Sequence, residues 1–448
     1  MATGEKVRSQ RSQLVLADAL HQQGWALERL GKPDQAEDLF KQCQVIYTAA
    51  GDRRGAAMAL TMQGESRYDR GDFPGALAAF QQTLEVFRAI GAQRDVARTM
   101  NSIGNVFYDN GKLEEAKGQY EQSLKIYEEL SDKRGIAGGL GNLANVYDSM
   151  GDLAAARQKQ EETLKAFRDV GDRRGEASTL NNLGNVQSEL GDLTSAKASY
   201  EQSIAVQEQI GYKRSRTFTL RGLSDIFREQ DKLSEAHKAA AQALELCKGL
   251  GDQNSIGLTQ LLLARIALET QKTSEAGNLA QDSANIFQKI KAPDGSVQAS
   301  AILAQIALEA GKPTDAAALI RQSISQVQLI TDRSLRLYVS IIEARTNAAN
   351  GKVAEAQEAL RKALADAHRY GYLAIEYEAR LALGTVERKS VTGRARLQEL
   401  QNDAKLHGFT RIARKARVAL TSDHAGTCKR YQRKEKLGAG IASPLPHV

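Results

Sequence analysis

Residues 101–116 read NSIGNVFYDNGKLEEA, and residues 181–196 read NNLGNVQSELGDLTSA. Both stretches carry asparagine, glycine and alanine at the same places, and their last alanine belongs to a row that recurs every 40 residues. The row consists of Ala36, Ala76, Ala116, Ala156, Ala196, Ala236, Ala276, Ala316 and Ala356. A fixed period of this length is typical of a solenoid, in which each unit buries its apolar face against the next.

Two further positions keep the same period and carry small or short side chains. Twelve residues before the alanine stand Gly24, Gly64, Gly104, Ala144, Gly184, Ser224, Ala264, Ala304 and Ala344, with Gly384 in the next unit. Seven residues after it stand Cys43, Thr83, Ser123, Thr163, Ser203, Ala243, Ser283, Ser323 and Ala363. Because a larger side chain would hold helices apart, these rows predict close helix packing at three points in every unit.

Glycines divide most units into two helices. The first helix of a unit ends at a glycine such as Gly111, and the second helix ends at a glycine such as Gly91 or Gly171. Within the second helix the apolar residues follow a 3.6-residue period, as at Ala116, Tyr120 and Leu124. Turns of a few residues leave no room for strands. The sequence therefore predicts an all-α solenoid of about ten helix-turn-helix repeats, which start near residues 17, 57, 97, 137, 177, 217, 257, 297, 337 and 377.

The ends of the chain depart from the period. Residues 1–12 are expected to form a flexible lead-in, and the repeat array is expected over residues 13–407. In the last unit the residues before Gly393 read as a turn, with a helix from about Arg394 to Leu406. Residues 408–420 predict a basic capping helix, which a solenoid needs at its end. Residues 421–448 lack the period and predict a basic disordered tail.

Composition narrows the class of function. The net charge of +7 is concentrated at the C-terminal end, where residues 394–420 hold seven basic and two acidic residues, so the array itself is near neutral. The three cysteines and six histidines are dispersed, which indicates no disulfide framework, metal site or cofactor. No stretch is long and apolar enough for a membrane span, so we expect a cytoplasmic protein. No catalytic motif occurs, and we expect no enzyme activity.

The small, glycine, alanine, aromatic and small positions of each unit resemble the tetratricopeptide repeat. The aromatic position holds Phe40, Phe80, Tyr120 and Tyr200, and departs from the pattern at Gln160 and Ala240. The period of 40 residues resembles the extended variety of this repeat, as in the adaptor Pins and in bacterial signalling proteins. The resemblance covers roughly residues 13–407. It implies a right-handed superhelix whose first helices line a concave face that binds extended peptides.

Two rows on the first helices form a polar ladder, because residues four apart share a helix face. Asn105, Asn145 and Asn185 match asparagines that pair with peptide backbone in the family, and their amides offer donors and an acceptor. We expect peptide contacts from Arg98, Asn101, Asn105, Asn145, Asn181, Asn185, Arg221, Asp225 and Arg228. The alternative is that the asparagines bond to neighbouring turns and hold the superhelix.

Three other patterns leave alternatives open. A basic edge of Arg54, Arg94, Arg134, Arg174 and Arg214 either holds an anionic ligand or pairs with acids of neighbouring repeats. An acidic row near the ends of the first helices is unfavourable to the helix dipole, so it is either solvated or compensated by a neighbour or a basic ligand. It comprises Asp69, Asp109, Glu189, Glu229, Glu269 and Glu309. The first helices of repeats seven to nine are apolar, so they are either more buried or form an apolar groove.

These features predict a non-enzymatic scaffold that binds an extended peptide or partner segment in its concave groove. A second hypothesis is a regulatory or sensor subunit that docks to a signalling enzyme or a transcription regulator. A third, direct nucleic-acid binding, is disfavoured because the basic edge lacks interleaved aromatic residues. The expected partner is a protein or peptide, and self-association stays open.

Overall fold

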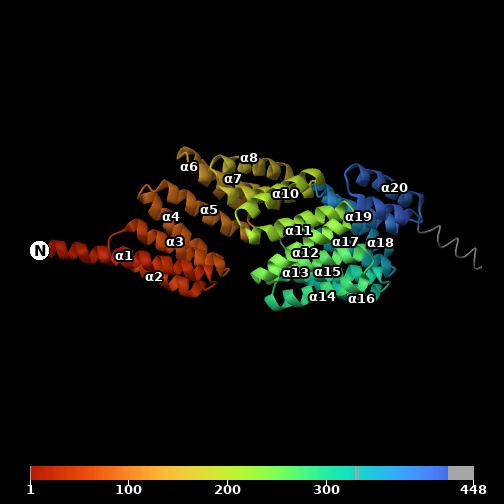
Figure 1. The fold of residues 1–448 in the computed structure, drawn as a ribbon, viewed down its shortest axis with the longest axis horizontal. Coiled ribbons are helices and arrows are strands. Elements are labelled where there is room, and N and C mark those ends of the chain that lie inside the picture. Colours follow the sequence, from red (N-terminus) through yellow and green to blue (C-terminus); the bar gives the residue numbers. More distant parts are fainter. Residues whose placement is uncertain (1, 328–329, 331, 422–448) are drawn as a thin grey trace, which may run out of the picture. The chain divides into compact units, whose positions relative to one another are not determined.

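The computed structural model describes residues 2–327, 330 and 332–421, and all regular structure in these ranges is helical. The helices form two compact units, Met1–Asp172 and Arg173–Val448. In unit 1 the helices follow one another in antiparallel pairs (Figure 1). They are α1 (Ala2–Arg29), α2 (Pro33–Ala49), α3 (Arg53–Asp69), α4 (Phe73–Ala89), α5 (Gln93–Asp109), α6 (Leu113–Glu129), α7 (Lys133–Met150) and α8 (Leu153–Asp169).

Unit 2 continues the same helix-turn-helix pattern and ends with a further helix over residues 410–421. Its other helices are α9 (Arg173–Glu189), α10 (Leu193–Gln209), α11 (Lys213–Glu229), α12 (Leu233–Leu250), α13 (Gln253–Glu269), α14 (Thr273–Ile290), α15 (Pro293–Glu309), α16 (Pro313–Val327), α17 (Arg333–Ala349), α18 (Val353–Arg369), α19 (Leu373–Val386) and α20 (Val391–Leu406). Helices α1–α20 make ten pairs, which confirms the predicted α-solenoid architecture.

Helix ends occur where the sequence predicted stops. The glycine stops adopt positive φ, for example 73° at Gly111. Where the pattern lacks glycine, Ser131, Asp231, Gln271 and Lys291 adopt the same left-handed conformation, with φ of 52°, 58°, 61° and 55°. The solenoid therefore keeps its turn geometry at these four places even though a side chain disfavours it there.

The three small rows pack the two helices of each repeat together. Every alanine of the 40-residue row is fully buried. A Cβ atom on Gly104 would lie 2.5 Å from Cε1 of Tyr120, so glycine allows the aromatic ring of the second helix to lie against the first helix. The third row also bonds: Ser123 Oγ donates to the carbonyl oxygen of Ala97 at 2.7 Å, and Ser203 does the same to Ala177 at 2.7 Å. The small side chains thus join the helices by contact and by hydrogen bond.

The ends of the solenoid differ in part from the sequence predictions. The expected turn at residues 391–393 is wrong, because α20 already begins at Val391. The reason is a cap: Gly393 N donates to Ser390 Oγ at 2.9 Å, and Gly393 lies so close to Glu387 that a Cβ atom would be 2.1 Å from its carbonyl oxygen. Residues 2–12, expected as a lead-in, are helical in α1. The predicted tail lies outside the described residues apart from residue 421.

The glycine of the ladder helix gives a first prediction. We expect Gly104→Ala to destabilise the protein by about 1–2 kcal/mol, because the gain in helix propensity is outweighed by overpacking against Tyr120. The matched control is Gly118→Ala in α6, where a Cβ atom meets nothing within 4 Å. That control should raise stability by up to about 1 kcal/mol. Urea denaturation followed by circular dichroism checks both, and equal shifts in one direction would contradict the packing argument.

Candidate functional site

Asn105, Asn145 and Asn185 are each held by a side chain of the second helix of their own repeat. In unit 1 the Tyr120 hydroxyl donates to Asn105 Oδ1 at 2.7 Å, and Gln160 Nε2 donates to Asn145 Oδ1 at 3.3 Å. In unit 2 the Tyr200 hydroxyl donates to Asn185 Oδ1 at 2.7 Å. Burial raises the pKa of Tyr120 and of Tyr200, which keeps both hydroxyls protonated as donors.

These bonds fix the orientation of the amides. Because the oxygen of Asn105 faces Tyr120, its NH2 group faces the other way, and the same holds for Asn185 and Tyr200. Asn105 is half-buried and Asn185 is exposed. Asn105 and Asn185 therefore have a structural bond through the amide oxygen, and their NH2 groups are directed away from the tyrosine.

The second ladder row is less completely bonded. Asn101 Oδ1 in unit 1 and Asn181 Oδ1 in unit 2 are covered and have no hydrogen-bond partner among the described residues. In unit 2, Asn181 Nδ2 donates to Asn182 at 3.4 Å, and the guanidinium of Arg221 lies 5.1 Å from the centre of the Phe218 ring. Burial lowers the pKa of Arg221. A ligand amide at either place would satisfy groups that lack partners within the chain.

The predicted charged neighbours have different surroundings. Arg98 is exposed, with Nη1 3.8 Å from Asp95 Oδ1. Arg228 is buried, and it donates to Asp225 at 3.1 Å and to Glu229 at 2.7 Å. Arg98 can therefore reach a ligand directly, whereas Arg228 and Asp225 are already bound to each other.

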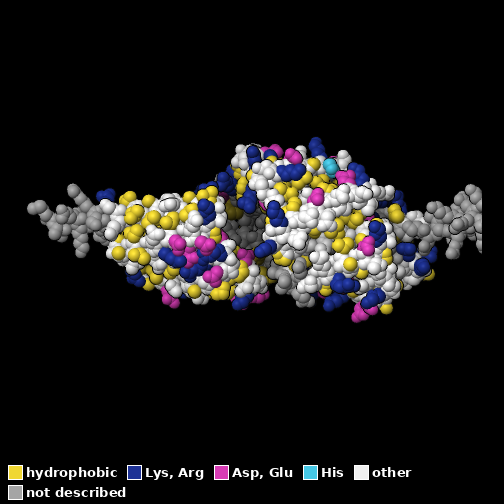
Figure 2. All heavy atoms as spheres, turned by 90° about the horizontal axis from the view of Figure 1, so that it is seen from below, with side chains coloured by type: hydrophobic (Ala, Val, Ile, Leu, Met, Phe, Trp, Pro, Cys, Tyr) yellow, Lys and Arg dark blue, Asp and Glu magenta, His cyan; other side chains and the backbone are white. Residues whose placement is uncertain are grey.

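Members of the predicted basic edge contact the following repeat. Arg54 Nε lies 2.7 Å from Asp95 Oδ2, and Arg94 Nε lies 2.9 Å from Asp132 Oδ2. In unit 2, Arg174 lies over the ring of Tyr212 at 5.7 Å. Arg134 and Arg214 are exposed. An anionic ligand at this edge would compete with the two ion pairs. On the face shown in Figure 2, basic and acidic side chains are interspersed rather than gathered into a basic band.

Two members of the acidic row are compensated by the helix over residues 410–421, the last helix among the described residues. Arg411 forms ion pairs with Glu229 of α11 at 2.9 Å, Glu269 of α13 at 3.3 Å and Glu378 of α19 at 2.6 Å. Only 3% of the Arg411 side chain and 6% of the Glu269 side chain are exposed. The row is therefore not simply solvated in unit 2, and we call these four residues the arginine clasp.

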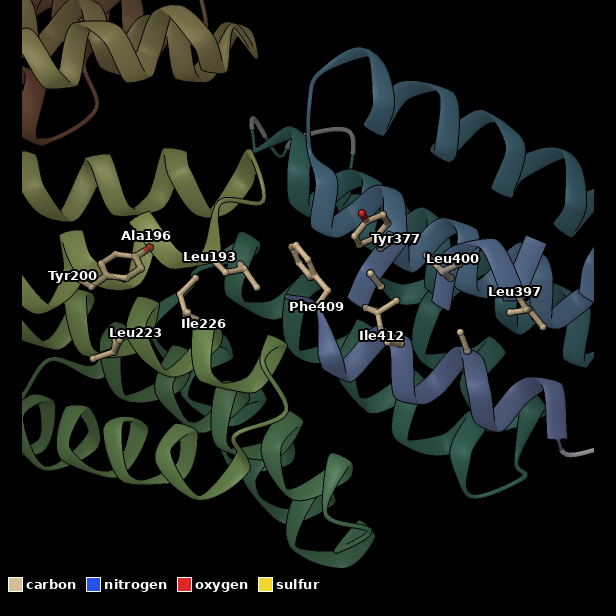
Figure 3. Packing of buried hydrophobic residues seen from close by; sticks show 13 residues of the cluster. Leu193, Ala196, Tyr200, Leu223, Ile226, Tyr377, Leu397, Leu400, Phe409 and Ile412 are labelled. Carbon is tan, nitrogen blue, oxygen red and sulfur yellow. The ribbon is translucent and has the colours of Figure 1, made fainter. Parts of the chain in front are cut away.

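Neighbouring cations and apolar residues extend the clasp. Arg414 contacts Asp231 at 2.7 Å and Glu269 at 2.9 Å, and Lys415 contacts Glu269 at 2.6 Å. Figure 3 shows Phe409 and Ile412 beside Tyr377, in one buried cluster with Leu193 and Ile226. The last helix thus joins repeats that are far apart in the sequence. The basic amphipathic pattern was visible in the sequence, but its partners were not.

The pKa values report the strength of this compensation. Burial raises the pKa of Glu269, but Arg411 and Lys415 outweigh it and lower the pKa to about 2. Burial also raises the pKa of Glu378, but the charges of Arg411 and Lys415 outweigh burial and lower this pKa to about 2. Burial lowers the pKa of Arg411, but Glu229 and Glu378 raise it well above its usual value. Glu269, Glu378 and Arg411 are therefore charged at neutral pH.

A cavity of about 680 Å³ lies among the first helices of unit 2, with Arg411 and Glu378 in its wall. It is lined from α11, α13, α15, α17 and α19, so these helices form an inner face. The Tyr338 hydroxyl donates to Gln305 Oε1 at 2.9 Å, and Arg265 lies over the Tyr338 ring at 4.8 Å. Sequence reasoning did not select these residues. Their signal was the ladder register itself, which contains Arg265 and Gln305.

The apolar first helices of repeats seven to nine are mainly buried, and their C-terminal ends line a cleft. In α13, Leu261, Leu262 and Leu263 are all buried, as are Ile302 and Ala304 in α15.

Among the described residues, no group of three or more metal-ligating side chains is placed to hold an ion.

Comparison with protein families agrees with this helical geometry. A MalT-like TPR region model matches residues 139–293, and two tetratricopeptide-repeat models match residues 55–129 and 18–49. The chain belongs to the tetratricopeptide-repeat family. A comparison with curated proteins gave no match. In the described part of this tetratricopeptide-repeat protein, no helix has the length and apolar character needed to cross a membrane.

Solved structures show the same fold at low sequence identity. Aspartyl phosphate phosphatase F from Bacillus subtilis aligns with a TM-score of 0.53 at 13% identity, over 65% of this chain and 76% of that one. The Rap conjugation gene regulator of plasmid pLS20, in complex with a Phr peptide, gives a TM-score of 0.51 at 12% identity, over 72% and 95%. A signal-transduction ATPase with a tetratricopeptide-repeat sensor from Pyrococcus horikoshii gives 0.50 at 15%, over 77% and 53%.

The clasp gives a second prediction. We expect Arg411→Met to destabilise the protein by about 3–5 kcal/mol, because it removes the cation that Glu229, Glu269 and Glu378 share, and these side chains are only 10%, 6% and 26% exposed. Arg417→Met is the matched control, since Arg417 is exposed on the same helix. The control should change stability by less than about 0.5 kcal/mol. Urea denaturation of the full chain measures both, and similar midpoints for the two variants would contradict the role given to Arg411.

The stability of the Arg411→Met variant should respond to a fall in pH in the opposite direction from that of the wild type. In the wild type, Glu269 and Glu378 have folded pKa values of about 2, below the unfolded value, so their contribution is complete near neutral pH. It is lost as pH falls from about 4.3 toward 2. In Arg411→Met, the loss of the Arg411 charge raises the pKa values of Glu269 and Glu378, so their protonation as pH falls relieves part of the cost of folding. The difference in melting temperature between wild type and variant should therefore shrink from pH 7 to pH 5, and a constant or growing difference would contradict this.

Proposed function

We propose that this protein is a non-enzymatic scaffold whose first helices hold an extended peptide segment of a partner protein. The observation that carries the proposal is the bond from a tyrosine hydroxyl to Oδ1 of Asn105 and of Asn185. It directs the amide NH2 groups away from the second helix, where they can donate to carbonyl oxygens. Such contacts bind peptide backbone without reading side chains.

Other residues of the first helices support the same function. Asn101 and Asn181 have amide oxygens without partners, and Arg98 is exposed beside Asp95. We propose direct ligand contacts for these residues and for Arg221. Arg228 and Asp225 bond to each other, so their proposed role is to position the inner face. The Rap regulator of similar fold was solved with a bound peptide, which is consistent with peptide recognition by this chain.

A regulatory subunit that docks to a signalling enzyme or transcription regulator would use the same face. One protein of similar fold is a conjugation gene regulator, and another is a signal-transduction ATPase with a tetratricopeptide-repeat sensor. These similarities favour the second candidate. In that case the bound segment belongs to the regulated protein, and the contacts above are unchanged.

Aspartate substitutions separate ligand binding from structural support. In Asn105→Asp, Asn145→Asp and Asn185→Asp, a carboxylate can still accept the bond from Tyr120, Gln160 or Tyr200, but the NH2 donors are lost. Peptides are first selected from a phage-displayed random library on the wild-type protein. We expect the triple variant to bind the selected peptides at least about tenfold more weakly while its melting temperature stays near that of wild type.

The matched control for this experiment is Asn285→Asp on α14, whose exposed Oδ1 accepts a bond from Gln281 in the same way. Its peptide affinity should equal that of the wild type. Failure to select any peptide, or equal affinity of the triple variant and the wild type, would contradict peptide binding by the ladder.

A further inference from the structure

A second concave feature of unit 2 lies on the other side of the arginine clasp. It is a cleft of about 940 Å³ between the helix at residues 410–421 and the C-terminal ends of α13, α15, α17 and α19. Glu269 and Glu378 line both this cleft and the inner cavity. The cleft contains none of the ladder residues of α5, α7 and α9, so it is a separate surface.

The walls of the cleft are largely apolar. They include Leu268, Leu308, Ala348, Leu381, Val386 and Ala419. Two larger apolar side chains in its lining are exposed: Val353 at the start of α18 is 44% exposed, and Val418 on the last helix is 53% exposed. Exposed apolar side chains beside an apolar cleft are typical of a surface that a partner covers.

The charged residues of the cleft are predominantly basic. Its cations are Arg345, Arg388, Lys389, Arg414 and Lys415, and its anions are Glu269, Glu309 and Glu378. Glu269 and Glu378 are paired with Arg411, and Arg414 and Lys415 are themselves paired with Glu269. On the rest of the lining, Arg345, Arg388 and Lys389 outnumber Glu309. The cleft therefore presents a net positive charge around an apolar floor.

We propose that this cleft binds an amphipathic helix of a protein partner, with an apolar stripe against the floor and acidic residues toward the basic rim. Charge complementarity selects this occupant. Residues 422–448 of the chain itself hold five Lys or Arg residues and two Asp or Glu residues, so the chain's own C-terminal segment has the wrong sign of charge. An apolar groove accepts a helix through side chains spaced three and four residues apart.

The test uses the full chain and a fluorescein-labelled synthetic peptide of 14 residues. The peptide has leucine at its second, fifth, sixth and ninth positions. The positions next to these leucines carry glutamate, and all other positions carry alanine. A matched peptide has lysine in place of each glutamate. Fluorescence anisotropy should show binding of the acidic peptide, and binding of the basic peptide at least tenfold weaker. Absence of binding by the acidic peptide, or equal binding of the two, overturns the proposal.

Two variants locate the peptide on the protein. Val418→Asp introduces a negative charge, of the same sign as the acidic peptide, at the apolar lining. Lys389→Glu removes an exposed cation of the rim. Each should weaken the acidic peptide at least fivefold with an unchanged melting temperature. Val45→Asp is the control, because Val45 is 68% exposed on α2 of unit 1, and it should bind as the wild type does. Wild-type affinity of both cleft variants overturns the proposal, and Lys389→Glu decides the matter if Val418→Asp does not fold.

The mass of the protein in solution distinguishes a second copy of the chain from an acidic partner. Light scattering of the wild type should show a concentration-independent monomer. A dimer that Val418→Asp converts to monomer would assign the cleft to self-association and overturn the proposal. This test is independent of the asparagine ladder, since peptide capture by the ladder can fail while the cleft binds, and the reverse.

Discussion

The guanidinium group of Arg411 contacts carboxylates on α11, α13 and α19, and the packing of unit 2 depends on this contact. Taking these charges out of water is costly, and the cost is offset only because all three anions share one well-placed cation with Arg414 and Lys415 nearby. In most solenoids each repeat contacts only its neighbours. Here repeats six, seven and ten are joined by one side chain, so an ion network holds this unit together as well as the packing of successive helices.

The period of the sequence predicted most of the fold because its determinants are local. The alanine row, the small rows and the turn residues act within one repeat, and each is visible at a fixed offset. The bond between Tyr120 and Asn105 was also within reach, since tyrosine follows asparagine by 15 residues again at Asn185 and Tyr200. The spacing alone does not show that the asparagine position bonds to the aromatic position. This bond occupies the amide oxygen and leaves the amide nitrogen for a ligand.

The clasp could not be predicted from the sequence in the same way. Its two signals were separate: acids at helix ends, where the dipole disfavours them, and a basic amphipathic segment near the end of the chain. No periodic offset connects Glu229 to Arg411, which are 182 residues apart. The cavity beside the clasp was hidden for a related reason. Its residues Arg265 and Gln305 lie in the ladder register, but their proximity to Tyr338 depends on how strongly the first helices converge within unit 2.

The separation between Arg411 and its partners also bears on the order in which unit 2 folds during synthesis. Repeats of a solenoid can form as they leave the ribosome because their contacts are local. The carboxylates of α11 and α13, however, remain without their cation until the last helix has been made, about 140–180 residues later. Repeats six and seven therefore lack this cation until the helix over residues 410–421 has been synthesised. A chain whose synthesis stalls before residue 411 would hold these carboxylates without the guanidinium group that Glu229 and Glu269 share.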